Sequence, residues 1–550
     1  MSNSTVPRKP APLSFAASQW FEGPDGQWSS FVVRAGTPEQ SFRVLPSTVT
    51  SETFLPLNSA CKEGSPTGCP FSRGVETYNG KPGDGFQPKN SGTWHEIGIY
   101  RVAAREELRY DASGLYGLES LGLMIANSGG PTLQSQVVAG VVNPKFWVGR
   151  LGMDVKPSNF SEFDNPQRSL IKTLKEENHI PSLSYGYTAG AYYKRPQAFG
   201  SLIYGGYDKT RLVMNNISFP FDTNDSRKPS LDIRSIVSQD STNRTVNLLP
   251  EGTVYSLIDF AEAQMWLPVS ACDAFAKAFN LTYDSSTDLY LVDPGTRSRL
   301  LQQNPSITFG LGPTANPAER LNIVLPYSAF DQQATYPIYP NATRYFPIRR
   351  ADNDTMYTIG RTFFQEAYVI IDYDRGNFSV HQALFPATTE KQDIVAILSP
   401  EPNDAVMRIA NHGPSWLTKG AIVGISIGGG TILVFLALLS LWLLRRHIVA
   451  KREAAAASRK IKWHIEIADQ PTIETGGSAF YEKDGRQVVE MEGHPLPELQ
   501  TAYGQSMNRD SGTNLSVIIE YYEMADSNSL YAEEEHYVVP LKNRPPPGWI

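Results

Sequence analysis

The sequence predicts an all-β domain, followed by one membrane-spanning helix and an acidic, polar tail. Short runs of β-type residues, separated by Gly, Pro, Asn and Asp, extend from about residue 19 to residue 384, which is typical of an all-β domain. Residues 420–444 form an uncharged stretch of 25 residues, enough to cross a hydrocarbon core of about 30 Å. Beyond residue 465 the chain is mostly aperiodic, so we expect the tail to be largely disordered.

Individual strands are expected where apolar residues cluster between turn-forming residues, as in residues 30–34, 200–206 and 368–373. Helical patterns are few. The apolar residues of 169–175 recur at i, i+4 spacing, and residues 271–279 form a second candidate helix. At 550 residues the chain is long enough for two or three domains with a large core.

Two segments of the chain resemble each other. Residues 44–56 read VLPSTVTSETFLP and residues 257–268 read LIDFAEAQMWLP. Both run from an apolar strand through a polar turn to an aromatic residue, Leu and Pro. Counting back nine residues from each final proline arrives at Ser47 in the first copy and at Asp259 in the second.

This repeat resembles the duplicated D-T-G-S/T loop of pepsin-like aspartic proteases. Further stretches match that family in its order and rough spacing, namely residues 36–40 (GTPEQ), 147–153 (WVGRLGM), 199–208 (FGSLIYGGYD) and 358–375 (TIGRTFFQEAYVIIDYDR). The resemblance covers most of about 365 residues and implies a bilobal, double β-barrel ectodomain. The resemblance gives an N-terminal extension (1–18), an N-terminal lobe (19–208) and a C-terminal lobe (209–386). The predicted membrane helix (420–444) then separates a stalk (387–419) from a cytoplasmic tail (445–550).

In the family each copy of the loop supplies one aspartate, and the two share a proton and a water molecule. Here Ser47 stands in place of the first aspartate, while Asp259 is retained. A serine hydroxyl hydrogen-bonds to water but does not change charge near working pH. Val49 also replaces the usual glycine of the first loop, and Phe260 replaces the usual threonine of the second. Because general acid–base assistance is worth about 10²–10⁴ in rate, we expect the proteolytic activity to be lost.

Further residues belong to the expected site. Tyr110 fits the tyrosine of the flap, the hairpin that covers the cleft in the family, although the residues after it depart from the usual tip. We interpret Glu52 and Glu262 as solvated loop carboxylates. Asp259 has two open interpretations, a residual catalytic or ligand-contacting role and a structural hydrogen-bond acceptor.

No metal or cofactor is expected. The ectodomain histidines are scattered and no Cys/His spacing suggests zinc; they are His95, His179, His381 and His412. The net charge of −7 gives no reason to expect nucleic acid as a partner.

The three cysteines are too few for a disulfide scaffold. Cys61 and Cys69 flank a flexible stretch, and we predict that they form a small disulfide loop. Cys272 is then left over, and we interpret it as a buried free thiol rather than an intermolecular bridge.

The membrane topology follows from a cluster of basic residues just after residue 444. By the positive-inside rule the C-terminal side is cytoplasmic and the ectodomain lies outside, as in a type I protein. Glycosylation sequons agree with this orientation, since one (Asn514) follows the span and the others precede it. Those before it start at Asn3, Asn159, Asn216, Asn224, Asn243, Asn280, Asn341, Asn353 and Asn377. Residues 1–20 contain no apolar signal-peptide core, so we expect either a signal upstream of a misassigned start or translocation begun by the membrane helix.

The tail offers two short motifs for cytoplasmic partners. Residues 521–524 (YYEM) fit a tyrosine-based sorting pattern, and residues 544–549 (RPPPGW) form a candidate polyproline II ligand.

Three functional hypotheses result. The favoured one is a single-pass membrane glycoprotein with a proteolytically inactive ectodomain that binds a peptide or protein in its cleft, at the plasma membrane or another membrane of the secretory pathway. The runner-up is a membrane-anchored acid endopeptidase with an atypical Ser47/Asp259 site. The third is a structural cell-surface protein whose cleft has no ligand.

Overall fold

The computed structural model of the protein describes residues 10–400, except for 103–104, 161–164, 225–227, 242–243, 315 and 388–389. This part of the chain is strand-rich, which confirms the predicted all-β class. Within it, no helix is long and apolar enough to cross a membrane. The predicted membrane span, the tail and residues 401–419 of the stalk lie outside the described residues.

The first half of the domain forms a mixed sheet. Its strands, in order, are β2 (Ala17–Glu22), β3 (Trp28–Ala35), β4 (Gln40–Ser47), β9 (Gly149–Gly152), β5 (Thr53–Pro56), β8 (Thr132–Val141), β7 (Ser113–Leu123) and β6 (His95–Arg101). β4 runs parallel to β9, and β5 runs parallel to β8. Because β3 also pairs with β7, the sheet curls back on itself as a barrel does.

The second half repeats this arrangement. Its strands, in order, are β22 (Leu321–Pro326), β21 (Ser306–Gly312), β15 (Ser230–Gln239), β17 (Val254–Ile258), β26 (Thr358–Ile359), β18 (Met265–Pro268) and β25 (Ile348–Ala351), with β16 (Thr245–Asn247) beside β15. β17 runs parallel to β26, and β18 runs parallel to β25. The order β17-β26-β18-β25 therefore matches β4-β9-β5-β8 of the first half.

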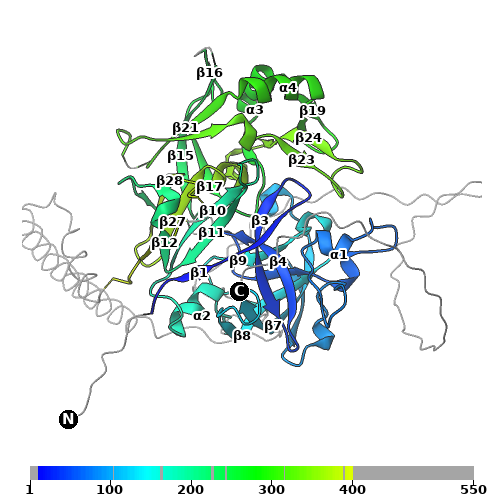
Figure 1. Ribbon diagram of the computed structural model, residues 1–550. Coiled ribbons are helices and arrows are strands. Elements are labelled where there is room, and N and C mark those ends of the chain that lie inside the picture. The colour runs from blue at the N-terminus through cyan, green and yellow to red at the C-terminus, as the bar shows by residue number, and fades with distance from the viewer. Residues whose placement is uncertain are drawn as a thin grey trace, which may run out of the picture. The chain divides into compact units, whose positions relative to one another are not determined.

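A third sheet joins the two halves. Its strands are β1 (Leu13–Phe15), β11 (Ala198–Tyr204), β10 (Ser184–Ala191), β27 (Ala367–Asp372), β28 (Asn377–Ala383) and β13 (Leu212–Val213), with β14 (Phe219–Pro220) also on β28. The antiparallel pair β10–β27 brings the halves together, with Ser184 opposite Asp372 and Tyr187 opposite Val369. In Figure 1 these strands lie between the blue and cyan strands of the first half and the green strands of the second.

Two smaller sheets complete the strand arrangement. One contains β19 (Thr282–Asp284), β20 (Leu289–Leu291), β24 (Thr343–Phe346) and β23 (Gln332–Ala334), and the other pairs β12 (Gly206–Asp208) with β29 (Ile394–Ala396). β29 lies inside the range that we assigned to the stalk, and β1 lies inside the expected N-terminal extension. Both strands pair with strands of the domain, so these flanking residues are part of the folded unit.

The helices are short and few. They are α1 (Cys69–Ser72), α2 (Leu170–Glu176), α3 (Val269–Phe279), α4 (Pro294–Gln303) and α5 (Arg361–Phe364). α2 and α3 confirm the two predicted helices, since each buries apolar residues at helical spacing. α4 was not predicted, because only Thr296 and Leu300 are buried along it. It begins instead at Asp293, whose side chain accepts hydrogen bonds from the backbone of Gly295 and Thr296.

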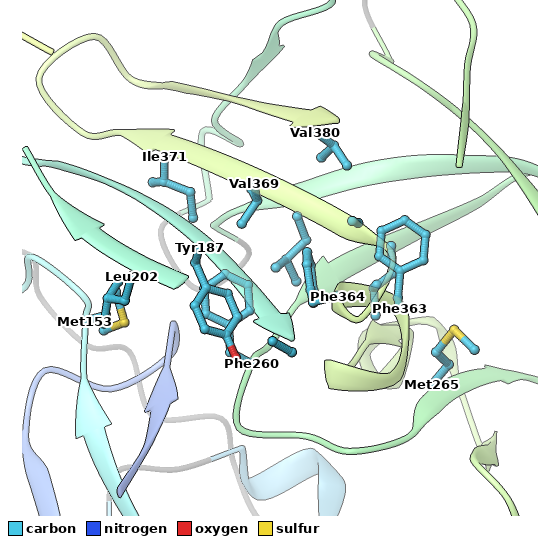
Figure 2. Close-up of a cluster of buried hydrophobic side chains, with 14 of the residues drawn as sticks. Met153, Tyr187, Leu202, Phe260, Met265, Phe363, Phe364, Val369, Ile371 and Val380 are labelled. Atoms are coloured by element: carbon cyan, nitrogen blue, oxygen red, sulfur yellow. The ribbon is translucent and has the colours of Figure 1, made fainter. Parts of the chain in front are cut away.

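One continuous apolar core extends through both halves and the sheet between them. Figure 2 shows its central part, where residues from the first half, such as Met153 and Tyr187, pack with Phe260, Phe364 and Val369 of the second. The loop that carries Asp259 is therefore anchored in the core by its next residue.

Candidate functional site

The two segments found to be similar in the sequence occupy equivalent places in the two main sheets. Ser47 is the last residue of β4, and Asp259 follows β17 directly. Each loop packs against a glycine at the end of the neighbouring parallel strand, Gly152 at the end of β9 and Gly360 directly after β26. A Cβ atom on Gly152 would lie 2.5 Å from the backbone carbon of Ser51, and one on Gly360 would lie 2.1 Å from the carbonyl oxygen of Gln264. Only glycine fits this close approach, so the two loops are built alike.

Thr48 links the two loops. Its hydroxyl donates a hydrogen bond to the carbonyl of Ile258 at 2.9 Å and accepts one from the backbone N–H of Phe260 at 3.4 Å. The residue in the equivalent place of the second loop is Phe260, which offers no hydroxyl in return. Its ring points into the core instead, 4.3 Å from the ring of Tyr187 and 4.8 Å from that of Phe364, measured between centroids (Figure 2). The bridge between the loops is therefore made by the threonine of the first loop, without an equivalent hydroxyl from the second.

Arg361 holds the second loop from behind. This buried arginine donates from Nη1 to the carbonyls of Phe260 at 2.9 Å and Ala261 at 2.6 Å. Its Nη2 forms an ion pair with Asp25 at 3.3 Å. A charged side chain thus satisfies backbone carbonyls that no strand partner reaches.

Ser47 and Asp259, the two residues expected to form the site, are both fully buried. Asp259 Oδ1 accepts a hydrogen bond from the backbone N–H of Ala261 at 2.8 Å. Within the described residues, neither Asp259 Oδ2 nor Ser47 Oγ has a hydrogen-bond partner. The Thr48 bridge brings both loops together, but neither side chain is open to solvent.

Two arginines lie beside Asp259, and sequence reasoning missed both. Arg105 Nη1 lies 3.8 Å from Asp259 Oδ2. Arg150, on β9, stacks against the rings of Tyr110 and Phe146, with its guanidinium carbon 4.7 and 4.5 Å from their centroids. Burial lowers the pKa of Arg150, but its interactions with Tyr110, Glu262 and Asp259 outweigh this effect and raise its pKa overall. Arg150 therefore stays charged and helps to neutralise Asp259.

Burial and the neighbouring Glu262 carboxylate raise the pKa of Asp259 to about 6, against the opposing effect of Arg105 and Arg150. The carboxylate is thus neutral in acid and ionised at neutral pH. A site with one such acid can exchange a single proton, but the partner loop presents a hydroxyl that does not titrate in this range.

The prediction that Glu52 and Glu262 are solvated is wrong. Both are buried, at 8% and 2% exposure. Glu52 accepts a hydrogen bond from Ser158 at 2.6 Å, and burial raises its pKa. Glu262 accepts one from the indole N–H of Trp266 at 3.3 Å. Loop sequences look polar in both cases, but each turn folds inward against its own sheet, which removes these side chains from water.

Tyr110 lies at the tip of the β6–β7 hairpin, at the edge of a pocket of about 490 Å³. Burial and Glu262 raise the pKa of Tyr110, so its hydroxyl stays protonated. The pocket is lined from both halves, and its main side chains are Leu108, Tyr110, Glu262, Trp266, Ile338 and Arg349. It reaches Glu262 but not Ser47 or Asp259.

The remaining predicted sites are placed as follows. Cys61 and Cys69 form the predicted disulfide, and Cys272 is a buried free thiol. Among the described residues, no group of His, Cys, Asp and Glu is arranged to hold a metal ion. Six of the sequon asparagines are exposed, namely Asn159, Asn216, Asn224, Asn280, Asn341 and Asn353. Asn377 is half-buried in β28, while Asn3, Asn243 and Asn514 lie outside the described residues.

A signal for Arg150 existed in the sequence. It is the charged residue within 147–153, an otherwise apolar strand segment, and a charge inside a buried strand needs a partner. Arg105 has no comparable signal, because its contact with Asp259 spans 154 positions of the chain.

The family model that describes eukaryotic aspartyl proteases matches residues 31–384, which include both loops, the hairpin with Tyr110 and the two arginines. No curated protein matches the chain.

Proposed function

Because this chain belongs to the eukaryotic aspartyl protease family, we propose that it is a member that does not cleave peptides and instead binds a peptide or protein ligand in its interlobe cleft. The observation that carries this proposal is the surroundings of Asp259. Its nearest charged partner is the guanidinium of Arg105, and the equivalent loop of the first half presents Ser47.

The chemistry of the family explains why this matters. Two carboxylates that share one proton let one act as acid while the other activates water. Ser47 cannot serve as the second carboxylate, and Asp259 is paired with an arginine, so the acid and the base of this mechanism are not both present. The missing acid–base step is worth about 3–5 kcal/mol of barrier, which corresponds to the usual 10²–10⁴ in rate.

We further propose that this domain lies outside the cell or in the lumen of a secretory-pathway compartment. It would be N-glycosylated and anchored by one helix at 420–444, with the tail at 445–550 available to cytoplasmic partners through its tyrosine and proline-rich motifs. The distribution of sequons and basic residues supports this orientation.

A cleavage assay tests the catalytic part. The full-length protein is incubated with a diverse peptide mixture from pH 3 to 7, beside an Asp259→Ala variant and with a transition-state-mimic inhibitor of aspartic proteases. We expect no cleavage that depends on Asp259. Cleavage that disappears in the variant and with the inhibitor would overturn the proposal in favour of an acid endopeptidase with a Ser47/Asp259 site.

A further inference from the structure

Residues 105–112, at the tip of the β6–β7 hairpin, rest on the second half of the domain, and we call them the lid. Leu108, in the short helix η3 (Glu106–Leu108), packs with Trp266, Ala351 and Met356. Arg109 Nη2 forms an ion pair with Asp352 Oδ2 at 2.7 Å. An apolar anchor and an ion pair therefore hold the lid closed in this structure.

Arg105 adds the deepest contact of the lid. Its Nη2 donates to Thr358 Oγ1 at 3.1 Å and lies 3.4 Å from the carbonyl oxygen of Thr355, while Nη1 approaches Asp259. The side chain is 7% exposed. A lid residue thus reaches across the cleft and lies beside the buried carboxylate.

While the lid is closed, Arg105 brings positive charge beside Asp259 through Nη1 and forms an ion pair with Glu107 through Nε. Asp259 and Glu262 are both buried, and each has one carboxylate oxygen without a hydrogen-bond partner within the described residues. Two guanidiniums oppose them, Arg150 from β9 and Arg105 from the lid. Lifting the lid withdraws Arg105 and leaves two carboxylates facing one cation. An unpaired buried carboxylate is costly, so the open site favours another cation.

We infer that Arg105 is an intramolecular substitute for a cationic group of the ligand, and that the open cleft binds a peptide through an arginine or lysine side chain at Asp259 and Glu262. This inference rests on the proposed binding function of the cleft. A guanidinium suits the site best, because its planar set of N–H donors can serve both free carboxylate oxygens. The adjoining pocket of about 490 Å³ has room for neighbouring residues of the peptide.

The other cations of that pocket do not compete for this role. Arg109 is paired with Asp352, Arg349 lies 3.6 Å from Asp288, and Lys145 donates to the carbonyl of Arg109. Each is thus already engaged on the pocket wall, whereas the free carboxylate oxygens lie under the lid.

Hydrogen exchange of the full-length protein tests the lid. We expect Arg105→Ala, and separately Leu108→Ser, to speed amide exchange across residues 105–112 by about tenfold or more, as loss of a buried contact would. Glu96→Ala is the matched control, because Glu96 is an exposed residue of β6 on the same hairpin and lies outside residues 105–112. If both lid variants exchange at the rate of the control, Arg105 and Leu108 do not hold the lid closed and the inference is wrong.

Binding of two fluorescent peptides tests the ligand class. One is an alanine–glycine heptapeptide with a central arginine, and the other carries citrulline, which has nearly the same shape but no charge. We expect the Leu108→Ser and Arg105→Ala proteins to bind the arginine peptide about tenfold more tightly than the citrulline peptide, and Glu262→Gln to reduce that preference. Equal affinities would overturn the cationic ligand while leaving peptide binding intact. No binding to any variant would overturn the proposed binding function together with this inference.

Discussion

At the scale of single residues, the site differs from a protease dyad through a few side chains whose surroundings decide their chemistry. Ser47 cannot take part in proton sharing, and Phe260 contributes to the core rather than to the loop. Asp259 is retained, yet it lies between Arg105 and Arg150 instead of facing a second carboxylate across the cleft. The remaining acid is therefore a buried charge that the protein must neutralise.

The pH dependence of stability should report this buried charge. The folded-state pKa of Asp259 is about 6 and its ordinary value is 3.8, so the folded protein binds this proton more tightly than the unfolded chain does. The stability that this proton provides is full below pH 3.8 and is lost as pH rises through 6. We expect Asp259→Asn to flatten the profile, so that its stability relative to the unchanged protein is about 2 kcal/mol higher at pH 7 than at pH 4.

Denaturant unfolding of the full-length protein and the Asn variant at pH 4, 5, 6 and 7 measures this difference. Glu262, Arg105 and Arg150 remain in both proteins, so the two proteins differ only at position 259. Parallel profiles would show that Asp259 does not titrate in this range.

At the scale of elements, the parallel strand pairs position the two loops. β4 with β9 and β17 with β26 direct Ser47 and Asp259 to one meeting point, where Thr48 crosses between them. The lid hairpin then closes over that point. The same supersecondary unit, used twice, thus explains why residues about 200 positions apart form one site.

The Thr48 bridge should be measurable on its own. Thr48→Val keeps the shape of the side chain but leaves the carbonyl of Ile258 and the N–H of Phe260 without this partner. We expect a loss of about 1–3 kcal/mol in unfolding free energy, because buried groups left unpaired are costly. Thr253→Val, at an exposed position just before β17, is the matched control and should change it by less than about 0.5 kcal/mol. Equal effects of the two changes would contradict the role of the bridge.

At the scale of the whole molecule, the folded unit extends slightly beyond the region that resembles the family. β1 and β29 add to it at either end, and the chain continues from residue 400 toward the predicted membrane span. Exposed sequon asparagines are distributed over both halves of this unit.

Glycan mapping of the full-length protein from a eukaryotic secretory host tests the proposed orientation. We expect occupancy at the six exposed asparagines and lower occupancy at half-buried Asn377, because a bulky glycan is compatible only with a surface position. Asn514 should carry no glycan, and glycopeptide mass spectrometry distinguishes these sites. A glycan at Asn514 would place the tail on the lumenal side and contradict the topology.

The sequence by itself determined the strand-rich class, helices α2 and α3, the disulfide between Cys61 and Cys69 and the repeat that pairs Ser47 with Asp259. These features depend on local periodicity, short spacing or direct similarity, which the order of residues contains. Only the tertiary structure decided that Glu52 and Glu262 are buried, that α4 forms and that Arg105 reaches Asp259. Burial and charge pairing depend on which distant segments meet, and a polar residue in a turn looks the same in sequence whether the turn faces water or the core.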